Sequence, residues 1–334
     1  MNATPVASVI IPAFQAQAFL DCAIRSVLEQ TLAEIELIVV DDCSTDATWT
    51  VLAEWARRDP RVVPLRQAVR GGPAAARNLA IAQARGRWLA LLDADDLYVP
   101  WRLAHMVDVA EATGADLLAD NQHRVDFRTG QDLGPRFADA TMRLPGPVTL
   151  TDAVRRDMPE HWARGDMFGL LQPIMRRRAL AARRLRYAED VIVGEDFLLY
   201  FQCIAAGARF HLTPAAGYVQ RLRGDSLSRS RDAMLHLSVA NRRMIAMAAR
   251  HAEPGLVALL RRRQRRIDID CFALLLERGA IGDALRHAHC STPARLLRHA
   301  RAAVGAFRRR HIAAAPRPCP HAAGRGTGPS SGPR

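Results

Sequence analysis

Three carboxylates stand close together where an apolar stretch of the chain ends. Trp88–Leu92 is an uninterrupted apolar run with the length of one buried strand, and Asp93, Asp95 and Asp96 follow it directly. Open α/β sheets bind ligands at the carboxyl ends of their strands, where these side chains would lie. Clustered carboxylates raise one another's pKa unless a positive charge offsets them, and a divalent cation shared with ligand phosphates does so. The alternative is a solvated loop in which Asp96 caps a helix that has Pro100 in its first turn.

Strand and helix signals alternate through the first third of the chain and would position these carboxylates. Apolar, often β-branched runs predict strands at 6–11, 36–40, 62–65 and 88–92. Helical spacing of apolar residues predicts helices at 18–30, 47–58 and 74–84. Because the connections are short and the strands continuously apolar, we expect an α/β fold with a mostly parallel sheet and helices on both faces.

The predicted strand ends share one rim of such a sheet. Pro12-Ala13 ends the first strand, Asp41-Asp42 the second, and Arg70-Gly71-Gly72 follows the third. Together with the acidic turn, this rim suits a nucleoside diphosphate with a cation. No GxGxxG follows the first strand and no GxxxxGK[ST] loop is present, which disfavours a dinucleotide site and a P-loop enzyme.

The later part of the chain gives weaker signals. Further elements are a helix at 100–113, a short strand at 116–119, loops or a hairpin over 121–147, a short helix at 151–157, a helix at 195–206 and a strand at 209–213. Beyond Asp232 the pattern is helical to about residue 310. Residues 316–334 are too poor in apolar side chains to fold, and we expect disorder there.

Composition indicates a globular cytoplasmic protein. Of the 334 residues 49% are apolar, enough for a sizeable core. No apolar run approaches the roughly 18 residues needed to span a bilayer, and no secretory signal opens the sequence. The six cysteines are scattered without a CxxC pair, which predicts free thiols in a reducing compartment.

Positive charge is concentrated at the C-terminal end. All basic residues are arginine, and residues 256–334 hold 16 of them against 4 acidic residues. Almost the whole net charge of +13 therefore lies in the last quarter of the chain.

Four motifs in order resemble the family 2 glycosyltransferases of the GT-A fold. They are VIIPAFQ at 9–15, ELIVVDDCSTD at 36–46, GPAAARN at 72–78 and LDADD at 92–96. The resemblance is specific over about residues 6–115, thinner over 165–230, and absent over 235–334. It implies a nucleotide-sugar-binding half at 1–115 and an acceptor half at 116–230. Beyond them, the residue pattern itself predicts a helical basic extension at 231–315 and a disordered tail at 316–334.

The resemblance also implies roles in donor binding. The Pro12-Ala13 backbone and Asp42 would hold the base and ribose, with Asp41 in support. Arg77 and Asn78 match an Ala-Arg-Asn motif that would line the nucleotide pocket.

The Asp-x-Asp motif of the family corresponds to Asp93 and Asp95. Asp95 would bind Mg²⁺ or Mn²⁺ bridging the donor phosphates, and Asp93 would contact the ribose and assist at the metal. Two departures from the family pattern are Cys43 in place of glycine and Arg70 in place of asparagine.

The catalytic base would come from the second half of the chain. Gly194-Glu195-Asp196, opening the helix at 195–206, resembles the Glu-Asp motif of the family, with Asp196 as base and Glu195 beside it. Without the resemblance, two acids in a first helical turn would only stabilise the helix dipole. Glu189-Asp190 is also a Glu-Asp pair, but it precedes two β-branched residues rather than a helix, so it is the weaker candidate for the base.

A basic segment follows the predicted strand at 209–213. Residues 218–228 resemble the family segment that closes over the diphosphate. The resemblance implies that Arg221 and Arg223 neutralise the leaving group and that Ser226 and Ser228 donate hydrogen bonds. The alternative is a basic surface loop.

These features predict a metal-dependent, inverting glycosyltransferase. It would move a sugar from a nucleotide-sugar donor, in the first place a UDP-sugar, to a glycan or lipid-linked acceptor in surface polysaccharide biosynthesis. A sugar nucleotidyltransferase and a non-catalytic nucleotide-sugar binder are the alternatives.

The arginine run at 261–266 allows three interpretations. In one interpretation the run binds an anionic membrane surface. In the simpler one it is the solvated face of a helix. Nucleic acid is disfavoured because no aromatic residues interleave the run. The membrane interpretation would place the protein peripherally on the inner face of the membrane.

Overall fold

The computed structural model describes residues 4–143, 146–162, 166–223, 232–250 and 253–288. Its contacts divide the chain into two compact units, Met1–Asp268 and Ile269–Arg334. All features of the site described below belong to the first unit.

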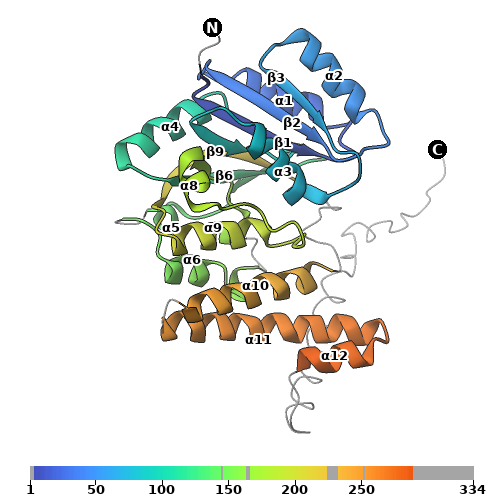
Figure 1. Ribbon diagram of the computed structural model, residues 1–334, viewed down its shortest axis with the longest axis vertical. Coiled ribbons are helices and arrows are strands. Elements are labelled where there is room, and N and C mark those ends of the chain that lie inside the picture. The colour runs from blue at the N-terminus through green and yellow to red at the C-terminus, as the bar shows by residue number, and fades with distance from the viewer. Residues whose placement is uncertain (1–3, 144–145, 163–165, 224–231, 251–252, 289–334) are drawn as a thin grey trace, which may run out of the picture. The chain divides into compact units, whose positions relative to one another are not determined.

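The predicted parallel sheet is present in the N-terminal part of the first unit. Its strands are β1 (Ala7–Ala13), β2 (Ile35–Asp41), β3 (Val62–Arg66) and β4 (Trp88–Leu91), in the parallel order β3-β2-β1-β4 (Figure 1). Between them run α1 (Leu20–Leu28), α2 (Thr48–Arg58) and α3 (Gly72–Gln83). Each of these elements lies within a few residues of its predicted position.

The sheet continues beyond β4 with mixed strand directions. The described residues complete a nine-stranded sheet with β8 (Ile174–Arg176), β6 (Leu117–Asp126), β9 (Phe210–Leu222), β5 (Leu97–Tyr98) and β7 (Asp132–Pro135). β8 is antiparallel to both β4 and β6, whereas β6 and β9 are parallel. The predicted mostly parallel sheet with helices is therefore confirmed, with an antiparallel portion in its second half.

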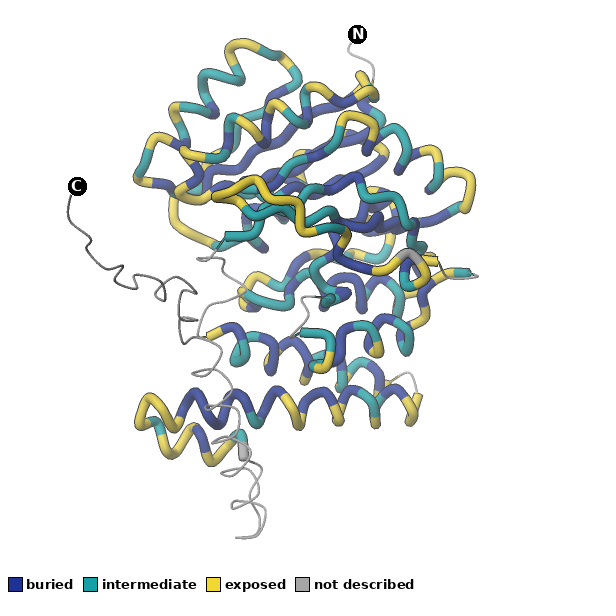
Figure 2. Tube along the Cα trace, turned by 180° about the vertical axis from the view of Figure 1, so that it is seen from behind, coloured by how far each residue is buried: buried dark blue, intermediate teal, exposed yellow. Residues whose placement is uncertain are grey.

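Side chains alternate across the sheet into two cores. Ile10, Ile38 and Leu91 point to one core, which α3 and α9 (Glu195–Ala205) cover. Val9, Val39 and similar residues point to the other core, which α1 and α4 (Arg102–Thr113) cover. Figure 2 shows the resulting buried stretches along the strands. A sheet with helices on both faces is what continuously apolar strands require.

Two strands are longer than predicted. The strand expected at 116–119 extends to Asp126, and the strand expected at 209–213 extends to Leu222. Their added halves pair with each other although they contain buried polar residues. Asp120, for example, is bound by Arg102 Nε and Nη2 at 2.8 and 2.7 Å, so that the buried charge is compensated. Apolar periodicity cannot reveal strands built in this way.

Short elements surround the second half of the sheet. They are α5 (Asp139–Met142), α6 (Leu150–Arg156), α7 (Pro159–Trp162), a 3₁₀ turn η1 (Phe168–Leu170) and α8 (Arg177–Arg183).

Two C-terminal helices contribute to the first core. Met244 of α10 (Ala233–Arg250) and Leu256 and Leu260 of α11 (Pro254–Glu277) are buried in the same cluster as α9. The boundary between compact units therefore lies at Asp268, within α11, further along the chain than the predicted domain boundary at residue 230. The second unit contains the end of α11 and α12 (Ile281–Ala288). The predicted helix beyond 288 and the predicted disordered tail lie outside the described residues.

Candidate active site

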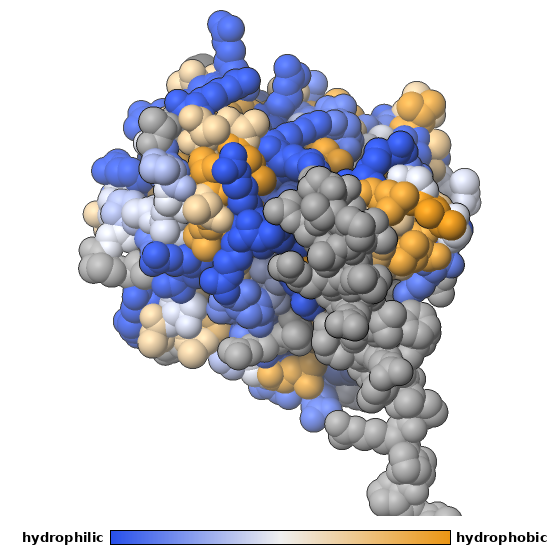
Figure 3. Space-filling model, turned by 90° about the horizontal axis from the view of Figure 1, so that it is seen from below, coloured by the Kyte–Doolittle hydropathy of each residue, from blue (hydrophilic) through white to orange (hydrophobic). Residues whose placement is uncertain are grey.

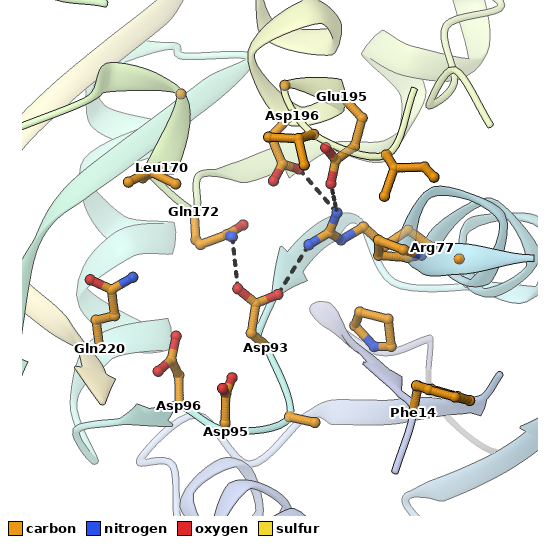
Figure 4. Close-up of a pocket in the computed structure, with 18 of the residues that line it drawn as sticks. Phe14, Arg77, Asp93, Asp95, Asp96, Leu170, Gln172, Glu195, Asp196 and Gln220 are labelled. Atoms are coloured by element: carbon orange, nitrogen blue, oxygen red, sulfur yellow. Dashed lines mark hydrogen bonds and ion pairs between the residues drawn. The ribbon is translucent and has the colours of Figure 1, made fainter. Parts of the chain in front are cut away.

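A cavity of about 710 Å³ opens at the carboxyl ends of β1 and β4. One side is lined by Pro12, Ala13 and Asp42, and the floor by the acidic turn 93–96. The other side is lined by η1, Gln172 and the first turn of α9 (Figure 4). The rim predicted from the strand ends is therefore assembled as one cavity.

Arg77 joins the acidic turn to the first turn of α9. Its Nη2 lies 3.0 Å from Asp93 Oδ1, and its Nη1 lies 2.9 Å from Glu195 Oε1 and 3.3 Å from Asp196 Oδ1. The Arg77 side chain is only 4% exposed, and the coulombic effect of the acids holds its pKa well above the ordinary value although burial opposes this. One guanidinium thus holds together three carboxylates from two distant parts of the chain.

Glu195 and Asp196, in the first turn of α9, both have raised pKa values. Burial and the neighbouring Asp196 raise the pKa of Glu195 to about 8, against the lowering effect of Arg77. Burial, and to a smaller extent Asp93, raise the pKa of Asp196 as well. A carboxyl group with a raised pKa is a stronger base when ionised, which suits proton removal from a hydroxyl.

Gly194 allows this turn to pack closely. It precedes α9 with φ at 89°, and a Cβ there would meet Leu237 Cδ2 at 2.8 Å. A side chain at position 194 would therefore be both strained and obstructed.

Asp95 and Asp96 have different surroundings. Asp95 pairs with Arg223 Nη1 at 3.4 Å, and its side chain is 33% exposed. Asp96 is buried, where it accepts hydrogen bonds from Tyr218 Oη at 2.8 Å and the Arg221 backbone N–H at 2.7 Å. Burial raises the pKa of both carboxyls, and that of Asp96 strongly.

The interpretation of Asp96 as a helix cap is wrong. α4 begins after Trp101 without a side-chain cap, and Asp96 instead fastens β9 to the acidic turn. A solvated loop is excluded by the burial of Asp96.

Asp42 is held by the start of α3. Its carboxylate accepts hydrogen bonds from the backbone N–H groups of Gly71 at 2.7 Å and Gly72 at 2.8 Å, and from Gln67 Nε2 at 2.6 Å. Asp41 does not line the cavity; its Oδ2 lies 3.1 Å from Arg66 Nε.

Arg70 and Cys43, the two departures from the family pattern, lie near Asp42. Arg70 stacks over the Phe14 ring at 3.9 Å, and both residues line the cavity. Cys43 has φ at 61°, the left-handed region that glycine adopts without strain.

The acidic turn fits a divalent cation that is shared with a ligand. Asp93 and Asp95 offer carboxylate oxygens from one turn, and their mutual repulsion contributes to the raised pKa of Asp95. Among the described residues no group of three or more His, Cys, Asp or Glu forms a complete metal cage. Mg²⁺ and Mn²⁺ suit such an incomplete donor set, because ligand phosphates and water supply the remaining oxygens.

Some predicted site residues lie away from the cavity. Asn78 is not among the lining residues; its amide binds the backbone of Tyr187 and, at 2.8 Å, Glu189 Oε1. Arg221 donates through Nε to the Asp95 carbonyl and stacks over Phe127, so it supports the turn from outside the lining. Ser226 and Ser228 lie outside the described residues.

Other residues of the site carried no sequence signal. Gln172, within an apolar stretch, lines the cavity and donates from Nε2 to Asp93 Oδ2 at 3.4 Å. Asp157 also lines the cavity and forms a buried ion pair with Arg263 of α11. No motif marks either partner, and Arg263 is part of the arginine run that the sequence presents as a solvated or polyanion-binding face.

Comparisons with known proteins agree with this geometry. Residues 8–170 match the model of the family described as Glycosyl transferase family 2. The chain is 34% identical over 337 residues to the succinoglycan biosynthesis protein ExoO of Rhizobium meliloti, covering 97% of this chain and 92% of that protein.

Solved structures share the fold. S. aureus TarS 1–349 in complex with UDP-GlcNAc is similar with a TM-score of 0.58 and 19% identity, covering 84% of this chain and 89% of that one. The mannosyltransferase PcManGT from Pyrobaculum calidifontis, in complex with GDP-Man and Mn²⁺, has a TM-score of 0.55 and 18% identity, covering 92% and 82% of the two chains. These likenesses confirm the expected GT-A fold.

Proposed function

The chain belongs to glycosyl transferase family 2, and from that premise we propose that it is a metal-dependent, inverting enzyme that uses a UDP-sugar. Its acceptor would be a hydroxyl of a glycan or lipid-linked glycan in surface polysaccharide biosynthesis, the process that the name of ExoO indicates for that relative. The observation that carries the proposal is Arg77, which joins a metal-competent acidic turn to a candidate base.

The nucleoside would pack against the side of the cavity that Pro12, Ala13 and Asp42 line. The bonds from Gln67 and the α3 N-terminus fix the Asp42 carboxylate before a ligand arrives. The diphosphate would then lie over the acidic turn. Arg223, paired with Asp95, is the lining cation placed to neutralise charge on the leaving group.

In the transfer step, ionised Asp196 would take the proton from the acceptor hydroxyl. The oxygen attacks the anomeric carbon while the bond from that carbon to the phosphate oxygen breaks, and the electron pair leaves with the nucleoside diphosphate. One displacement from the opposite face inverts the anomeric configuration. Glu195 is bound to Arg77 and holds that guanidinium beside the base.

Mg²⁺ or Mn²⁺, when bound, would stabilise negative charge on the departing diphosphate. Asp95 is the first candidate ligand because its carboxylate is partly exposed. Asp93 is the second, since it shares its oxygens with Arg77 and Gln172.

Donor binding tests this proposal directly. Calorimetric titration with UDP-, GDP- and dTDP-sugars, with and without Mn²⁺, should show metal-dependent binding of one donor by the wild type. Asp95→Ala should lose that metal dependence, whereas Asp108→Ala, at an exposed position on α4, should keep it.

A turnover assay separates the base from the donor site. Asp196→Asn should bind the donor as the wild type does but transfer no sugar. Donor binding without any transfer by the wild type, across acceptor extracts, would instead favour a non-catalytic nucleotide-sugar binder. Release of inorganic pyrophosphate would favour a nucleotidyltransferase.

Peripheral membrane association is a further part of the proposal. Arg263 and Gln264 within the arginine run are buried, while Arg261 and Arg265 are exposed. On the face that Figure 3 shows, hydrophilic side chains surround smaller hydrophobic patches. None of the described helices is long and apolar enough to cross a bilayer.

Charge reversal tests the membrane association better than deletion from residue 256, because Leu256 and Leu260 belong to the core. Arg261→Glu/Arg265→Glu should reduce pelleting with anionic liposomes. Unchanged pelleting would contradict a role for this run.

A further inference from the structure

Gln172, one of the residues that line the cavity, has a buried side-chain oxygen without a hydrogen-bond partner among the described residues. Gln172 is only 4% exposed, and its Oε1 accepts no hydrogen bond from the residues that the structure describes. A buried amide oxygen without a partner costs roughly 1–3 kcal/mol, so it marks a position where a ligand group is expected.

The orientation of the amide is fixed by its neighbour. Gln172 Nε2 lies 3.4 Å from Asp93 Oδ2, and an amide turned the other way would direct Oε1 at that carboxylate. The amino group therefore faces Asp93, and the carbonyl oxygen faces away from it.

The backbone around Gln172 is held from two sides. Its carbonyl oxygen accepts a hydrogen bond from Arg102 Nη2 at 2.7 Å, and the preceding Leu171 carbonyl accepts one from Tyr200 Oη at 2.8 Å. Arg102 is itself completely buried and paired with Asp120. A side chain supported in this way keeps its position without a ligand, as a recognition group should.

Figure 4 shows Gln172 between Asp93 of the acidic turn and Asp196 of α9. In the proposed function the diphosphate lies at the acidic turn and the attacked carbon lies near Asp196. The transferred sugar must then span the space beside Gln172. Within the described part of the chain, Gln172 Oε1 is an acceptor without a partner, so the complementary ligand group is a donor, and a sugar hydroxyl supplies one.

We propose that Gln172 Oε1 accepts a hydrogen bond from one hydroxyl of the transferred sugar and makes this residue a determinant of donor specificity. This inference rests on the proposed function. It adds a sugar contact that neither the side of the cavity proposed for the nucleoside nor the acidic turn supplies.

The experiment compares Gln172→Met with the wild type on the accepted donor and on its monodeoxy sugar analogues. Methionine keeps the length of the side chain and removes the acceptor oxygen. We expect kcat/KM for the parent donor to fall roughly ten-fold, the loss of one hydrogen bond. For the analogue that lacks the contacting hydroxyl, wild type and variant should have the same kcat/KM. Removing the sugar hydroxyl and removing the Gln172 oxygen eliminate the same hydrogen bond. Gln131→Ala, in the exposed turn before β7, is the control and should match the wild type on all donors.

The outcomes separate the two proposals. No transfer by the wild type from any nucleotide sugar would refute the proposed function itself. The sugar contact alone would be refuted if the wild type transfers sugar but no deoxy analogue cancels the effect of Gln172→Met. In that case the variant would lower kcat/KM by the same factor for the parent donor and for every deoxy analogue. Thermal unfolding midpoints of wild type and variant check that folding is unchanged, and Gln172→Asn offers a second variant in which the oxygen is withdrawn rather than removed.

Discussion

Removing the guanidinium of Arg77 should destabilise the protein through the three carboxylates that it holds. Arg77→Met leaves Asp93, Glu195 and Asp196 without their shared counter-charge. Methionine fills much of the same volume, so the change tests charge rather than packing.

The expected magnitude follows from the burial of the arginine. Its side chain is 4% exposed, and removing one partner of a buried ion pair costs about 3–5 kcal/mol. A loss of this size should lower the thermal midpoint on the order of 10 °C. The control Arg58→Met breaks an ion pair whose partners are 64% and 44% exposed, and should change stability by no more than about 0.5 kcal/mol.

The effect should depend on pH in a definite direction. Glu195 has its pKa raised from 4.5 to about 8 in the folded protein, so the folded state holds this proton more tightly than the unfolded state. The resulting contribution to stability is lost as pH rises through that window. Arg77 lowers the pKa of Glu195 and Asp196, so its removal should cost more at pH 8.5 than at pH 5.

Urea denaturation of both variants at these two pH values provides the measurement. Adding Glu195→Gln to Arg77→Met should recover part of the lost stability, most at the higher pH. If Arg77→Met unfolds at the same urea concentration as Arg58→Met, or if its loss of stability is independent of pH, Arg77 does not stabilise the fold as a shared counter-charge.

Two further predictions concern stability away from this cluster. Arg263→Met should lower the free energy of unfolding, measured by urea denaturation, by about 3–5 kcal/mol, because both side chains of the Arg263–Asp157 pair are 1% exposed. The double variant Arg263→Met/Asp157→Leu should lose clearly less, and equal losses would contradict an effect of buried charge. The control Arg265→Met, at an exposed position, should be near neutral. Cys43→Gly should raise the free energy of unfolding by about 1 kcal/mol, since φ is 61° there. The control Cys22→Gly, within α1, should instead lower it by about 0.3 kcal/mol. A loss of stability for Cys43→Gly would show that the cysteine side chain outweighs the strain.

The part of the cavity formed by the N-terminal strands could be predicted because its signals are local. Two apolar strands lead directly into residues that line the cavity, as Ile11 leads to Pro12 and Leu92 to Asp93. A parallel sheet then brings these ends together without further information.

The rest of the cavity was less predictable because its residues depend on distant partners. Gln172 gains its place from Arg102 and Asp93, which lie far from it in the sequence. The buried polar halves of β6 and β9 resemble loops until they are paired. Asn78 matched a motif, yet its role is to hold Tyr187 rather than to line the cavity.

The arginine run shows the same limit most clearly. By composition Arg263 is indistinguishable from its exposed neighbours, and only the buried Asp157 and Asn241 explain its burial.

The Arg263–Asp157 pair has a consequence for how the protein is made. These residues are 106 positions apart, and Asp157 lines the active-site cavity. During synthesis from the N-terminus, the N-terminal strands and the lining residues at their ends leave the ribosome long before the helix that neutralises Asp157. A nascent chain can therefore form the strand ends of the cavity early but neutralises Asp157 only when residue 263 has emerged. A chain that ended before that point would leave this lining carboxylate without its ion-pair partner.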